Sequence, residues 1–185
     1  MIVYLHGFSS SPHSHKAQVL GSYMAERGLA AQYACPALPL LAGVAIREIE
    51  KRVSPGACLV GSSLGGFYAT YLAEKHGVRA VLINPAVEPH LGLRAYLGPQ
   101  QNLHSGEPYE LTEAHLREWE RLYVPRITPQ RYLLLVETGD EVLDYREAVQ
   151  RYAGAEQVVI QGGDHSLQSF PQHLERILRF GGLAP

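Results

Sequence analysis

The chain has 185 residues, the size of one domain that can bury its own core. Its formal net charge of -2 and the mixed placement of its charges give no basic stripe, which argues against nucleic acid and anionic membranes as partners. No apolar run approaches the roughly 20 residues of a membrane span, and the N-terminus lacks the pattern of a signal peptide. We therefore expect a cytoplasmic protein with no membrane span, in which Cys35 and Cys58 are reduced thiols.

Apolar runs alternate with amphipathic segments along most of the chain. Runs that are apolar on both faces predict buried strands at residues 2–5, 30–35, 57–60, 80–83, 132–136 and 157–160. Apolar residues at helical spacing predict helices at residues 13–27 and 42–53, a helix ending near 76, and helices at 145–152 and 167–180. This alternation is typical of a mostly parallel sheet with helices on both faces, so we expect an α/β fold.

The stretch from 86 to 130 breaks this alternation, since it is long and rich in Pro, Gly, Tyr and His. One helix is expected behind a Thr112 cap, with an apolar face made of Leu116, Trp119, Leu122 and Tyr123. We interpret the stretch as an insertion that forms a substrate lid. The alternative is that it forms an extra packing layer or a subunit contact. The aromatic residues of this stretch could either line an acyl pocket or anchor the packing of the insertion. They are Tyr96, Tyr109, Trp119 and Tyr123.

The most informative motif follows the apolar run that ends at Val60. Residues 61–65 read Gly-Ser-Ser-Leu-Gly, the spacing of a nucleophile elbow, in which a sharp turn from strand to helix holds the central residue in strained geometry. Gly61 and Gly65 supply the small neighbours that such a turn requires. We predict that Ser63 is a nucleophile, and the alternative is an ordinary turn between a strand and a loop.

A serine hydroxyl needs a base to take its proton and an acid to orient that base. On this scaffold the chain order is serine, acid, histidine, and only three aspartates follow Ser63: Asp140, Asp144 and Asp164. Asp140 comes directly after a strand and a glycine turn, at the sheet edge where ligands bind, so we predict that it is the acid. Asp144 is the alternative acid, but it is expected to cap the next helix, and Asp164 is expected to brace its loop. A cap or a surface charge is the alternative role for both Asp140 and Asp144.

The base and the oxyanion site follow from two further loops. His165 comes after the last predicted strand, behind the paired glycines 162–163, and we predict that it is the base. The negative oxygen of a tetrahedral intermediate needs preorganised donors, which on this scaffold are two backbone N–H groups. Leu64 supplies one, and Phe8 supplies the other in the loop after the first strand, where Gly7 permits a close approach.

With these residues assembled, the chain resembles the YqiA-type small bacterial esterases of the α/β-hydrolase superfamily. The resemblance runs nearly end to end, and its carriers are residues 4–8 with 10–12, 61–70, 82–86, 138–145 and 162–166. It implies a three-layer α/β-hydrolase fold over residues 1–185 and no metal or organic cofactor. It also implies a triad of Ser63, Asp140 and His165 that cleaves a small-molecule acyl ester or acyl thioester.

The resemblance includes one departure from larger α/β-hydrolases. This chain begins at the strand at residues 2–5, so the first strands of the usual sheet are expected to be absent. One sheet edge is then less covered, which favours a homo-oligomer formed through that edge. Two other functions stay open: a non-catalytic binding protein with this scaffold, and a hydrolase of amide, peptide or carbon–carbon bonds.

Overall fold

The computed structural model describes residues 1–102 and 106–183 and contains a six-stranded sheet in the order β2-β1-β3-β4-β7-β8. Every pair of neighbouring strands in it is parallel. The strands are β1 (Ile2–Leu5), β2 (Tyr33–Ala34), β3 (Cys58–Ser62), β4 (Arg79–Ile83), β7 (Tyr132–Glu137) and β8 (Glu156–Ile160). The central strands β3, β4 and β7 are buried almost throughout, as their apolar sequences require.

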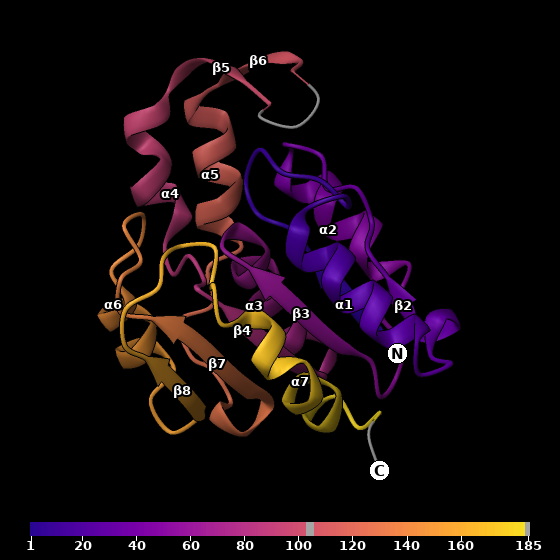
Figure 1. Cartoon of the computed structure of the whole chain (residues 1–185). Coiled ribbons are helices and arrows are strands. Elements are labelled where there is room, and N and C mark those ends of the chain that lie inside the picture. Colours follow the sequence, from indigo (N-terminus) through magenta and orange to yellow (C-terminus); the bar gives the residue numbers. More distant parts are fainter. Residues whose placement is uncertain (103–105, 184–185) are drawn as a thin grey trace.

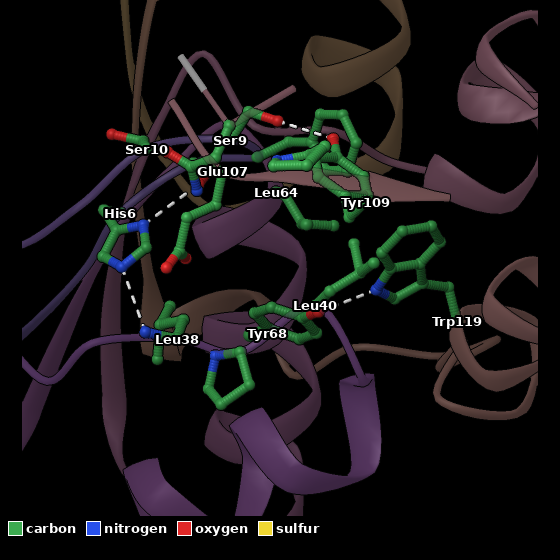
Figure 2. Close-up of a pocket in the computed structure, with 15 residues that line it drawn as sticks. His6, Ser9, Ser10, Leu38, Leu40, Leu64, Tyr68, Glu107, Tyr109 and Trp119 are labelled. Carbon is green, nitrogen blue, oxygen red and sulfur yellow. Dashed lines mark hydrogen bonds between the residues drawn. The ribbon is translucent and has the colours of Figure 1, made fainter. Parts of the chain in front are cut away.

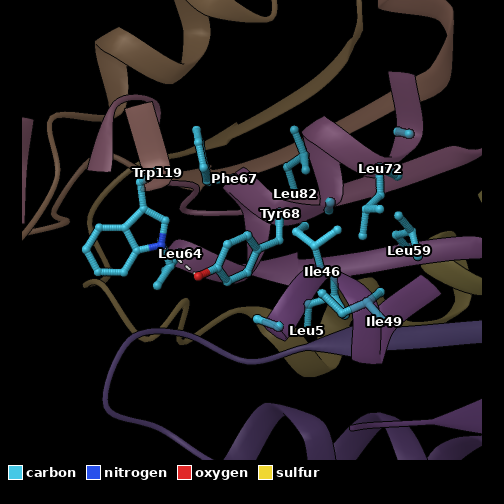
Figure 3. Close-up of a cluster of buried hydrophobic side chains, with 14 of the residues drawn as sticks. Leu5, Ile46, Ile49, Leu59, Leu64, Phe67, Tyr68, Leu72, Leu82 and Trp119 are labelled. Carbon is cyan, nitrogen blue, oxygen red and sulfur yellow. Dashed lines mark hydrogen bonds between the residues drawn. The ribbon is translucent and has the colours of Figure 1, made fainter. Parts of the chain in front are cut away.

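Helices cover both faces of this sheet (Figure 1). They are α1 (His15–Ala25), α2 (Ala42–Glu50), α3 (Leu64–His76), α6 (Tyr145–Arg151) and α7 (Leu174–Phe180). Along β1, Val3 and Leu5 pack in a buried cluster with α2, α3 and α6, whereas Ile2 and Tyr4 pack with α1 and α7. Figure 3 shows the first of these clusters. The expected three-layer α/β fold is confirmed.

The predicted insertion lies between β4 and β7 and contains short elements of its own. They are α4 (Pro89–Gly92), a 3₁₀ turn (Leu93–Tyr96), β5 (Gly98–Gln101), β6 (Pro108–Leu111) and α5 (Glu113–Arg121). The antiparallel β5–β6 hairpin lies beyond one end of α5 (Figure 1) and was not predicted, because strand residues Pro99 and Pro108 interrupt the usual pattern. Helix α5 begins after Thr112 as predicted but ends at Arg121, so Leu122 and Tyr123 follow it rather than belonging to its face.

Two predicted elements lose a whole turn or more to a 3₁₀ turn in the structure. The strand expected at 30–35 pairs with β1 only at Tyr33–Ala34, because a 3₁₀ turn occupies Ala30–Gln32. The helix expected at 167–180 begins as an α-helix only at Leu174, since a 3₁₀ turn containing Pro171 precedes it. Both cysteines are free, with Cys58 buried and Cys35 partly buried. Within the described residues, no helix is both long and apolar enough to cross a membrane.

The turn from β3 into α3 depends on glycines packed against other backbone. A Cβ added at Gly65 would lie 2.0 Å from the carbonyl oxygen of Leu5, and one added at Gly61 would lie 2.3 Å from the carbonyl oxygen of Gly65. Backbone atoms at these distances cannot move aside without displacing a strand. The elbow therefore packs directly on the end of β1.

We expect Gly65→Ala to lower the free energy of unfolding by about 3 kcal/mol, because β1 must shift to admit the methyl group. Gly92→Ala is the matched control, since a Cβ there meets no atom within 4 Å. Its stability should equal or slightly exceed that of the parent. Urea denaturation of the three proteins checks this, and equal midpoints for Gly65→Ala and the parent would refute the packing argument.

Candidate active site

The three residues predicted as a triad follow three parallel strands. Ser63 comes directly after β3, Asp140 shortly after β7, and His165 in the loop after β8. Since parallel strands end at the same edge of a sheet, these loops share the edge at which ligands bind in open α/β sheets.

Ser63 has the backbone geometry of a nucleophile elbow. Its φ of 53° and ψ of -120° place a non-glycine residue in a strained region, at the N-cap of α3. Its N–H donates to the carbonyl of Ile83 at 3.0 Å, and its carbonyl accepts from the N–H of Ala86 at 3.1 Å. The segment after β4 therefore fixes the backbone of Ser63 on both sides.

The side chains of Asp140 and His165 form a hydrogen bond with each other. Asp140 Oδ2 lies 2.8 Å from Nδ1 of His165, while its Oδ1 accepts from the N–H groups of Val142 at 2.8 Å and Leu143 at 2.9 Å. Burial raises the pKa of this carboxyl, but the hydrogen bonds from His165, Leu143 and Val142 outweigh it and leave the pKa below its usual value. The ionised carboxylate accepts from Nδ1, which leaves Nε2 of His165 as the nitrogen able to take a proton.

The other two aspartates have the structural contacts expected of them. Asp144 is the N-cap of α6 and accepts from the N–H of Arg146 at 3.0 Å. Asp164 braces its own loop by accepting from the N–H of Ser166 at 2.8 Å and from Nε2 of Gln168 at 2.7 Å. Neither contact is with the imidazole ring, so Asp140 is the aspartate placed to orient His165.

The loop after β1 lies against Ser63. A Cβ added at Gly7 would come 3.3 Å from Cβ of Ser63, a tight contact that favours a glycine at this position. On the other side, Leu64 is the first residue of α3, and N–H groups in the first turn of a helix have no partner within the helix. The backbones that contain the two expected donors, those of Phe8 and Leu64, thus flank the serine.

A hydrogen bond ties the insertion to this loop. The hydroxyl of Tyr109, in β6, lies 2.7 Å from Oγ of Ser9, which has a positive φ of 50° (Figure 2). The Tyr109 ring also packs edge to face on Phe8, with 6.2 Å between ring centroids. The hairpin therefore supports the strained turn next to Phe8.

A cavity of about 310 Å³ opens beside these residues, between the loop after β1, the segment before α2 and the hairpin (Figure 2). Its lining is mixed: it includes apolar side chains such as Phe8, Leu38, Leu40 and Leu64, and polar ones, namely His6, Ser9, Ser10, Asn102 and Glu107. Nε1 of Trp119 donates to the hydroxyl of Tyr68 at 2.7 Å, which gives both polar groups a partner within the wall (Figure 2). The volume suits a small organic group that makes both apolar and polar contacts with the wall.

The structure shows which of the insertion's aromatic residues line the cavity and which pack elsewhere. Tyr109 and Trp119 line the cavity, and Trp119 is at the same time a fully buried packing anchor (Figure 3). Tyr96 is half-exposed, and Tyr123 packs against His90 outside the cavity. Lining and packing are therefore combined in one residue.

Sequence comparison assigns the chain to a family. A family model described as "Uncharacterised protein family (UPF0227)" matches residues 1–182. The chain belongs to the UPF0227 family. A UPF0227 protein of Serratia proteamaculans is 26% identical over 198 residues, which cover 97% of this chain and 98% of that protein. One from Yersinia enterocolitica is 28% identical over 205 residues, with the same coverage. This membership agrees with the resemblance drawn from the sequence.

Solved structures show which fold this UPF0227 protein has. The mouse α/β-hydrolase domain-containing protein 10 superposes with a TM-score of 0.73 at 18% identity, over 98% of this chain and 88% of that chain. The esterase domain of a Rhodothermus marinus protein superposes with a TM-score of 0.64 at 19% identity, over 98% and 84%. The α/β-hydrolase fold expected from the sequence is confirmed.

One residue of the site, Glu137 at the end of β7, was not predicted. In this UPF0227 protein its carboxylate is buried and accepts from the N–H groups of Asp164 at 2.9 Å, Gln168 at 3.0 Å and Ser169 at 2.8 Å. Burial raises its pKa, but the hydrogen bonds from Ser169, Asp164 and Gln168 outweigh burial and leave the pKa below its usual value. Glu137 thus folds the loop that carries His165. A charged residue at the end of an otherwise apolar strand was the available signal.

Proposed function

We propose that this UPF0227 protein is a serine hydrolase that cleaves carboxylic acyl esters or thioesters through an acyl-enzyme. The observation that carries the proposal is the 2.8 Å contact between Asp140 and His165, at the sheet edge where the strained Ser63 follows β3. A buried carboxylate that orients an imidazole, at the same sheet edge as a serine elbow, supplies the groups that activate a serine hydroxyl. The proposal treats residues 1–185 as one domain.

In the first half-reaction, Ser63 Oγ attacks the carbonyl carbon of the ester while Nε2 of His165 takes the hydroxyl proton. Asp140 holds the imidazole and stabilises the imidazolium that forms. The N–H groups of Phe8 and Leu64 stabilise the negative oxygen of the tetrahedral intermediate. The intermediate collapses as His165 returns the proton to the departing alcohol or thiol, which leaves the acyl group on Ser63.

In the second half-reaction, water attacks the acyl group and gives a proton to His165, and the acid is released as that proton returns to Ser63. The cavity lined by Phe8 and Leu64 supports this assignment, because it begins at the residues expected to hold the oxyanion and is large enough for an acyl group.

Fluorophosphonate labelling tests the proposal, because such probes react with an activated serine and not with an ordinary one. We expect one adduct on the parent protein, which peptide mass mapping should place on Ser63. A folded parent protein without an adduct near neutral pH would favour the non-catalytic binding protein instead.

A further inference from the structure

Asn84 has no role in the mechanism above, yet it lies between the segments that carry Ser63, Asp140 and His165. It follows β4, the strand between β3 and β7, and is 2% exposed. Its φ of 38° is positive, a conformation that asparagine adopts more readily than most residues. A buried polar side chain on strained backbone at a sheet edge calls for an explanation beyond packing.

The Asn84 amide contacts the loop that carries the predicted base and the strand that leads to the predicted acid. Its Nδ2 donates to the carbonyl oxygens of Asp164 at 3.0 Å and His165 at 3.1 Å. Its Oδ1 accepts from the N–H of Glu137 at 3.1 Å, at the end of the strand that leads to Asp140. One side chain therefore sets the position of the His165 backbone relative to β7.

The same short segment holds the nucleophile. Ile83, immediately before Asn84, accepts from the N–H of Ser63, and Ala86, two residues after it, donates to the carbonyl of Ser63. Residues 83–86 are thus bonded to the backbone of Ser63 on one side and to the backbone of His165 on the other. The spacing between these two loops therefore depends on this segment.

We propose that Asn84 is a positioning residue that sets the reach of His165 to Ser63, an inference that rests on the proposed function. Proton transfer requires about 2.6–3.2 Å between the heavy atoms, and a displacement of about 1 Å costs about 100-fold in rate. Only an amide fits the site, because two carbonyl oxygens need donors and one N–H needs an acceptor.

Asn84→Asp tests this with a side chain of the same shape. The introduced carboxylate faces two carbonyl oxygens without a proton to donate, so the loop should move away. We expect kcat for a short p-nitrophenyl ester to fall about 100-fold, with KM close to that of the parent. Repulsion from the carbonyls raises the pKa of the introduced group. The ratio of parent to variant kcat should therefore narrow as the pH falls, because the protonated group regains one donor.

Two further variants separate positioning from stability. Asn84→Gly accepts the positive φ and lacks the amide, so it should lose kcat as well, and it serves if Asn84→Asp does not fold. Tyr152→Phe removes a different buried hydrogen bond, the 2.7 Å contact with Thr70 Oγ1, and should leave kcat unchanged. Unfolding midpoints for all proteins set an assay temperature at which each is folded.

The possible outcomes separate the two proposals. An inactive, unlabelled parent would overturn the proposed function itself. An active parent with parent-like kcat in both Asn84 variants would overturn the positioning role alone. The positioning role is also overturned if Tyr152→Phe loses as much kcat as Asn84→Asp, because the loss would then reflect general destabilisation.

Discussion

Ser63→Ala is expected to lower kcat for short acyl esters by about 10⁶-fold, the size of loss seen when a serine nucleophile of this type is removed. The variant keeps the Cβ and the backbone hydrogen bonds to Ile83 and Ala86, so the fold should survive. Hydrolysis of p-nitrophenyl acetate and butyrate, measured with a circular dichroism check of folding, gives the result.

The neighbouring serine provides the matched control. Ser62 precedes Ser63 by one position and is buried, but it belongs to β3 rather than to the turn. Ser62→Ala should retain most of the parent kcat. If Ser63→Ala hydrolyses these esters as fast as the parent, Ser63 is not the nucleophile and the acyl-enzyme mechanism is wrong.

Asp140→Asn is expected to lower kcat by about 10⁴-fold, because an amide cannot hold the imidazole in the tautomer that leaves Nε2 unprotonated. The Asp140 side chain is 1% exposed and is bonded to Val142 and Leu143 as well as to the ring, so the new amide is held in the same place. Initial rates over a pH series, with the protein in large excess where turnover is slow, measure the loss.

Asp144→Asn is the control for that experiment. Asp144 caps α6 and lies beside Arg146, and asparagine is as good an N-cap as aspartate. We expect a change in kcat of less than about threefold. A larger loss from Asp144→Asn than from Asp140→Asn would move the acid to Asp144.

The predictable parts of the fold are those whose sequence signals lie close together along the chain. The strand before Ser63 and the helix after it were predicted together, because an apolar run, two glycines and helical spacing all occur close together along the chain. The hairpin at 98–111 was missed because prolines lie inside its strands. The strand at 30–35 was overestimated because its sequence suits a strand while its place at the sheet edge gives it few partners.

For the candidate site too, the residues identified by local motifs could be predicted, and those defined by distant contacts could not. Loops that follow strands could be assigned from the sequence, and the order of serine, acid and histidine narrowed the choice of aspartate. Asn84 could not be found, because its partners lie in a loop 80 residues further on. For Glu137 the charge at a strand end was a signal, but its partner Gln168, 31 residues further on, could not be predicted. In the wall of the cavity, Tyr109 and Trp119 were candidates for an acyl pocket, whereas Leu38 and Leu40 were not, because they come from a separate segment of the chain.

The hydrogen bond between Tyr109 and Ser9 has a consequence for how members of this family diverge. The hairpin lies in the second half of the chain, yet it supports a turn only a few residues from the N-terminus. A chimera that exchanged residues 86–130 between two relatives would bring a new neighbour to that turn. In such a chimera, the inserted segment and residues 7–10 should therefore be exchanged together.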